Sequence, residues 1–154
     1  MSKDFIDKDQ VWRKMVSDLR ELEGKSVSTG VIGSDAVKDN KGITMVDLAV
    51  IHEFGTRYIP QRSFIRQGWD ANQTNIQKFA DNVINSVFDM KSTLTALNRL
   101  GLTMRTGVLE QFSKSGDPTW SPNTPETIKA KKSDKPLIDE GLLRASISYV
   151  ISKD

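Results

Sequence analysis

Apolar residues recur every three to four positions along most of the chain, and this spacing predicts amphipathic helices. Two of the periodic stretches are followed by a glycine, Gly24 and Gly55, which commonly ends a helix. Gly101 and Gly107 lie inside the last long stretch, where each lowers the helix propensity by about 1 kcal/mol relative to alanine. Their alternative role is to let another helix approach closely. The predicted helices, with their capping residues, cover 5–23, 44–55, 63–88 and 92–112.

Hydroxyl and carboxylate side chains stand where these helices begin, and they can accept hydrogen bonds from the free N–H groups of a first turn. Pro125 fits the first position of a further short helix over 124–132, and Pro136 would end that helix. A last helical turn is predicted after position 139. The predicted capping residues are Thr44, Ser63, Ser92, Thr124 and Asp139.

Two segments, 26–33 and 146–152, alternate between apolar and polar residues, as strands do. Because a lone strand is not stable in water, the two segments are expected to pair with each other. We therefore expect one α+β domain over 1–154, with a small, mainly antiparallel sheet packed with three main helices and shorter C-terminal helices. Polar, turn-forming residues predict mobile loops at 34–42 and 113–123.

The composition is that of a soluble globular protein, because 37% of the 154 residues are hydrophobic and 27% are charged. The absence of cysteine excludes a disulfide framework, a thiol nucleophile and a thiolate metal site. No apolar run approaches the roughly 18 residues that a membrane span needs. The first residues also lack the apolar core of a signal peptide. These features favour synthesis and assembly in a cytoplasm.

The net charge is only +2, which argues against a dedicated duplex-DNA binder with a strongly basic face. Positive charge is nevertheless dense in one segment near the C-terminal end. Such a run is usually a solvated loop, and the alternative is contact with phosphate or with an acidic partner. The cluster consists of Lys129, Lys131, Lys132 and Lys135.

His52 and Glu53 are the first residues to weigh for chemistry, because His52 is the only histidine of the chain. A zinc-protease motif would need a second histidine where the chain has Thr56, so we predict no metal site. The side chains of adjacent helical residues point about 100° apart, which does not favour acid–base catalysis by the two residues together. We expect His52 to cap or pack at the helix end and Glu53 to bind backbone N–H groups or an arginine. A hydrolase that uses both side chains is the alternative.

The three tryptophans differ in context. Trp12 and Trp69 lie on apolar faces of predicted helices, so both are expected in the core. Trp120 lies in a loop between Pro118 and Pro122. It is either a lid over the core or an exposed anchor at an interface, and the sequence favours neither.

Three arginines surround Pro60, which fixes the turn between two predicted helices. They are either solvated, with one of them closing a pair with Glu53, or they form a patch that grips carboxylates of a neighbouring subunit. The second interpretation suits the planar guanidinium, which binds carboxylates through two parallel hydrogen bonds. The three residues are Arg57, Arg62 and Arg66.

The motif IHEFGT at 51–56, followed by IPQRSFIR at 59–66, resembles the virion-morphogenesis or tail-completion proteins of long-tailed phages, including Mu-like and lambda-like types. Within 136–147 the chain departs from the family pattern at Glu140, where the family has threonine before a glycine. With three further segments the likeness spans most of the chain. These are VSTGVIG at 27–33, WSPNT at 120–124 and PLIDEGLLRASI at 136–147.

The resemblance implies a structural virion protein with an α+β domain, no enzymatic activity and no cofactor. The implied partners are the tail terminator or tail tube, head connector or adaptor proteins, and further copies of this chain in a ring of six-fold or twelve-fold symmetry. DNA would pass through that ring, and no membrane is involved. The implied place is the neck or tail of the virion, after assembly in the host cytoplasm. The expected interface residues are Glu53, Phe54, Gly55, Arg57, Pro60, Arg62, Ser63, Phe64, Arg66 and Trp120.

Overall fold

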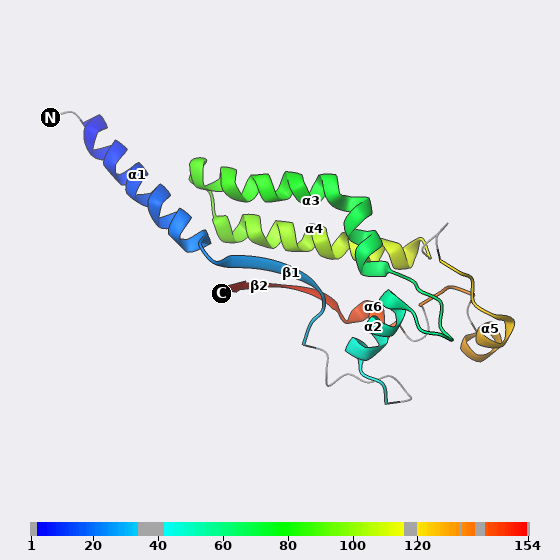
Figure 1. Ribbon diagram of the computed structural model, residues 1–154. Coiled ribbons are helices and arrows are strands. Elements are labelled where there is room, and N and C mark those ends of the chain that lie inside the picture. Colours follow the sequence, from blue (N-terminus) through cyan, green and yellow to red (C-terminus); the bar gives the residue numbers. More distant parts are fainter. Residues whose placement is uncertain (1–2, 34–41, 116–119, 133, 138–140, 154) are drawn as a thin grey trace.

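The computed structural model describes residues 3–33, 42–115, 120–132, 134–137 and 141–153. These residues form a small α+β fold, which confirms the predicted class (Figure 1). The elements in chain order are α1 (Lys3–Leu22), β1 (Lys25–Val31), α2 (Met45–Phe54), α3 (Phe64–Phe88), α4 (Thr93–Ser113), α5 (Pro125–Lys131), α6 (Leu142–Ala145) and β2 (Ile147–Lys153).

The sheet of the described residues consists of β1 and β2, which pair antiparallel as the alternation predicts. Its register places Lys25 opposite Lys153 and Val31 opposite Ile147. The first strand is shorter than predicted, because the chain turns at Gly33, whose φ of 67° lies in the left-handed region. The sheet thus joins the start of the domain to its end.

Helices α3 and α4 lie side by side and run antiparallel (Figure 1). They cross closely at Gly68 and Gly107, where a Cβ atom added to Gly68 would lie 2.6 Å from the Cα atom of Val108. The close approach expected at Gly107 is therefore confirmed. Gly101 serves a different neighbour, because its face lies against the ring of Tyr149 on β2.

The main core lies where α2, α4, α6 and β2 meet the start of α3. Its fully buried side chains include Met45, Phe64 and Phe112. The rings of Phe64 and Phe112 lie 5.2 Å apart in an edge-to-face arrangement, and Trp120 packs edge-to-face on Phe112 at 6.4 Å. These contacts between aromatic rings hold the segment around position 120 against α3 and α4.

Helix α1 extends away from this core (Figure 1). The prediction that Trp12 is a core residue is wrong, because 65% of its surface is exposed. Trp69 was also expected inside, and it is 43% exposed on α3. In both cases the apolar face exists, as the periodicity indicates, but no described element covers it fully.

Three of the five predicted caps are confirmed. The Thr44 hydroxyl accepts from the Asp47 N–H at 3.1 Å, and Ser92 and Thr124 cap α4 and α5 in the same way. Asp139 lies outside the described residues, as do positions 34–41 and 116–119 of the predicted mobile loops. Ser63 precedes α3 but makes no side-chain cap, and the reason lies in α2.

Candidate assembly interface

The corner between α2 and α3 is a closed loop held by its own backbone. Gly55 ends α2 with a φ of 73°, and its N–H donates to the Ile51 carbonyl at 2.8 Å. The Thr56 hydroxyl accepts hydrogen bonds from the next turn, including one from the Ile59 N–H at 3.0 Å. The Arg62 N–H then donates to the His52 carbonyl at 2.7 Å. These bonds return the chain to α2 and set the direction in which α3 begins.

Glu53 caps α3 from inside the corner. Its carboxylate accepts from the N–H groups of Ile65 at 2.9 Å and Arg66 at 3.1 Å, and its side chain is buried. This confirms the expectation that Glu53 binds backbone N–H groups. The predicted Ser63 cap is wrong, because the Ser63 hydroxyl donates to the Glu53 carbonyl at 3.0 Å instead. A negative charge at a helix N-terminus also complements the helix dipole.

Arg62 is buried rather than solvated, because only 6% of its surface is accessible. Its Nη2 donates to the Ser121 carbonyl at 3.0 Å and to the Asn123 Oδ1 at 3.1 Å. Burial lowers the pKa of its guanidinium from the usual value. Arg62 therefore ties the corner to the segment that carries Trp120.

Half of the expected contact residues are thus part of the protein interior. Trp120 is a lid over the core, because it is buried against Phe112, so the alternative of an exposed anchor is wrong. A buried side chain cannot reach a partner without unfolding, and we therefore correct the predicted interface. The residues withdrawn from it are Glu53, Arg62, Ser63, Phe64 and Trp120.

The remaining motif residues do face outward. Phe54 is 64% exposed, and Tyr58, which the sequence analysis passed over, is 86% exposed with the Arg57 guanidinium 5.8 Å from its ring centre. Pro60 and Arg66 are exposed as well. The residues around the turn thus include exposed aromatic rings and arginines, which are residue types enriched at protein interfaces.

An apolar groove lies beside these residues on one face of α2. It has a volume of about 600 Å³, and Phe54, Arg66 and Trp69 line it together with residues of β1 and α4. Val50 also lines it and is about half exposed. The sequence analysis missed the groove, because helical periodicity marks an apolar face without showing whether another element covers it.

His52 lies on the opposite side of α2 from the groove and lines a different cavity with Arg62 and Lys131. Its Nδ1 is buried and has no hydrogen-bond partner among the described residues. Burial, followed by the charges of Arg62 and Lys131, lowers the pKa of His52 from 6.5 to about 4. The ring is therefore neutral near pH 7, and it packs at the end of α2 as expected.

The pKa of His52 leads to a prediction for stability. The unfolded chain takes up a proton near pH 6.5 and the folded protein only near pH 4, so the stabilising effect of the neutral ring is lost as the pH falls through this window. At about pH 4.5 the loss should be about 2 kcal/mol after allowance for the partly open site. Urea unfolding of the native chain and His52→Gln at about pH 7.5 and about pH 4.5 measures it. An equal loss of stability in both proteins would contradict the assignment.

The four lysines do not form one surface. Lys129 and Lys132 are exposed, with Lys132 just past the end of α5, whereas Lys131 is half-buried and lines the cavity of His52. Lys135 is exposed in the next segment. Three of the four are thus exposed, and the fourth lines the cavity.

The described residues contain no group of three or more acidic or histidine side chains that could hold a metal ion. Within the same residues, no helix is both long and apolar enough to cross a membrane. The Glu53 carboxylate is occupied by two N–H groups, and it has no hydrogen bond to His52.

Comparisons of this chain with models of known protein families, with curated proteins and with solved structures find no match. The resemblance of 51–56 and 59–66 to tail-completion proteins therefore stays a prediction from the motif itself. The fold and the corner stand on the structure alone.

Proposed function

We propose that this protein is a structural subunit of a phage head–tail junction, and that the surface beside the α2–α3 corner contacts the neighbouring protein in the neck. The proposal rests on the motif resemblance for its biological setting. The observation that carries the contact surface is an apolar groove lined by the exposed side chains of Phe54 and Trp69, beside a turn that internal hydrogen bonds hold in place.

The chemistry of this surface suits protein association. Val50, Phe54 and Trp69 would leave water on docking, and apolar area buried at an interface is favourable by about 25 cal/mol per Å². Arg66 lines the groove, is exposed, and can pair with a carboxylate of the partner. Because the corner is preorganised, little conformational entropy is lost when the partner binds.

Replacing Phe54 and Trp69 by serine tests the contact surface. We expect a folded protein that no longer joins heads to tails, because the two largest apolar groups of the groove are gone while the core stays intact. Joined particles are counted by electron microscopy after adding purified protein to a phage lysate that lacks its own copy. A fall of about 100-fold corresponds to the loss of about 3 kcal/mol of binding energy.

The matched control is Leu94→Ser together with Ile84→Ser. Both side chains are about half exposed, and they lie toward the other end of the α3–α4 pair. This variant should join particles like the native protein. Normal joining by the Phe54 and Trp69 variant would exclude the surface, and equal failure of both variants would point to a general loss of solubility instead.

A further inference from the structure

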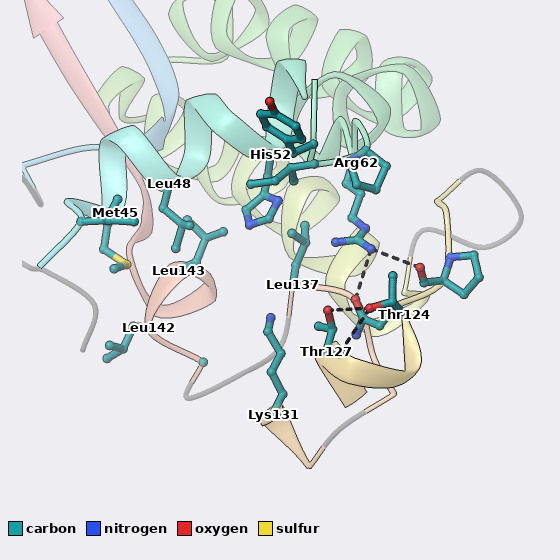
Figure 2. A pocket seen from close by; sticks show the side chains of 17 residues that line it. Met45, Leu48, His52, Arg62, Thr124, Thr127, Lys131, Leu137, Leu142 and Leu143 are labelled. Atoms are coloured by element: carbon teal, nitrogen blue, oxygen red, sulfur yellow. Dashed lines mark hydrogen bonds between the residues drawn. The ribbon is translucent and has the colours of Figure 1, made fainter. Parts of the chain in front are cut away.

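The cavity that contains His52 is the most unusual polar environment of the described residues. It has a volume of about 400 Å³ and lies between α2, the corner, the segment around position 122, α5 and α6. Figure 2 shows Leu48, Leu142 and Leu143 on one side, Leu137 in the middle, and His52, Arg62 and Lys131 directed toward the interior from three different segments. The apolar part of the wall comprises Met45, Leu48, Ile59, Leu137, Leu142 and Leu143.

Arg62 keeps an unused donor in this cavity. Its Nε and Nη2 bind the carbonyl groups of the segment around Ser121 and the Asn123 side chain, but Nη1 has no acceptor in the described residues. Among the described residues, the acceptors of Arg62 are neutral, and no carboxylate pairs with its guanidinium.

Two further nitrogen-bearing side chains line the cavity. The Nδ1 of His52 is buried and has no partner, although a buried polar atom normally has one. Lys131 lines the same cavity from α5. None of the described residues that line the cavity is aspartate or glutamate. The site thus combines a buried arginine, a lysine and a free imidazole nitrogen with an apolar wall.

We propose that this cavity binds a carboxylate carried on a short aliphatic body. The Arg62 guanidinium and the Lys131 ammonium would bind the two carboxylate oxygens, and the imidazole of His52 would lie beside them in the cavity wall. The aliphatic body would lie against Leu48, Leu137 and their neighbours. A phosphate fits less well, because its hydrated double charge would lie against a wall that is mostly apolar.

This chemistry has two sources, a free aliphatic acid or an acidic or C-terminal carboxylate of a partner protein. The proposal does not depend on the function proposed above. Val46, Val50 and Phe54 line the groove on one face of α2, whereas Leu48 and His52 line the cavity on another face. The test of the cavity and the test of the groove can therefore give opposite results.

His52 is the only histidine, so its imidazole gives one set of NMR signals that reports directly on the cavity. Hexanoate and 1-hexanol are the matched probes, since they share an aliphatic body and differ in charge. Hexanoate should shift the His52 signals in a saturable manner and raise the pKa of His52 above its value of about 4, because an anion offsets Arg62 and Lys131. Hexanol should not raise that pKa. Equal effects of both probes, or no saturable shift by about 10 mM hexanoate, would overturn the proposal.

Variants separate the site from a nonspecific effect. Lys131→Met should weaken hexanoate binding about threefold or more, whereas Lys129→Met, on the same helix but outside the cavity, should leave it unchanged. Arg62→Met should abolish binding, and the lysine pair keeps the test decisive if that variant does not fold. The same affinity in both lysine variants would contradict the assignment.

A short peptide that ends in leucine, used with a free and with an amidated C-terminus, distinguishes the two sources. Tighter binding of the free peptide than of hexanoate identifies a protein carboxylate as the ligand. Tighter binding of hexanoate identifies a free acid. Either order supports the carboxylate site, provided that the amidated peptide binds more weakly than the free one.

Discussion

Replacing Gly68 with alanine is expected to lower the free energy of unfolding by about 3 kcal/mol. The new Cβ atom would lie 2.6 Å from the Cα atom and 2.8 Å from the N atom of Val108, so α3 and α4 would have to separate along their contact. A backbone contact cannot be relieved by a side-chain rotation, and overpacking of this kind costs about 1–3 kcal/mol or more. The shift in the midpoint of urea unfolding measures the loss.

The sign of this result is decisive. Alanine favours an isolated helix over glycine by about 1 kcal/mol, so helix propensity alone predicts that Gly68→Ala stabilises the protein. Thr74→Ala, at an exposed position of the same helix, is the control in which only propensity acts. Gly107→Ala should also destabilise, because its Cβ atom would lie 2.8 Å from the Gly68 carbonyl oxygen. A gain in stability from Gly68→Ala would show that the helices do not cross as described.

Glu53→Ala is expected to cost about 3 kcal/mol. The change removes a buried carboxylate that accepts from two N–H groups at the start of α3, and it leaves both donors inside the corner without a partner. Asp47→Ala, which removes an exposed carboxylate from the same α2 helix, should cost less than about 1 kcal/mol. Chemical unfolding compares the two variants.

The Glu53 prediction also separates a structural role from a catalytic one. If Glu53 only caps α3, Glu53→Gln should recover part of the stability, because the amide oxygen can still accept one hydrogen bond. A Glu53→Ala protein as stable as the native chain would show that the carboxylate does not hold the corner, and the alternative of a hydrolase would then regain weight.

Much of the fold could be predicted, because its signals are local. The caps at Thr44, Ser92 and Thr124 follow from residues within one helical turn. The two strands follow from their alternation, and their pairing follows because each needs a partner. The Ser63 cap failed because its place is taken by Glu53, ten positions earlier, which periodicity cannot relate to the start of α3.

The candidate surface was predictable only in part, because exposure depends on distant segments. Arg62 looks like a solvated arginine until the chain about 60 residues later brings the carbonyl group of Ser121 to it. Trp69 looks like a core residue, and it is exposed because no described element lies across that face of α3. Phe54 and Arg66 were identified through the motif and remain at the surface.

The pairing of Lys25 with Lys153 gives the molecule two distinct poles. At one pole α1 leaves and β2 ends, so the chain enters and leaves the compact part at the same place (Figure 1). At the other pole the sheet ends at Val31 and Ile147, near α2, α6 and the corner. A protein that docks at the corner therefore approaches from the side opposite both ends of the described chain.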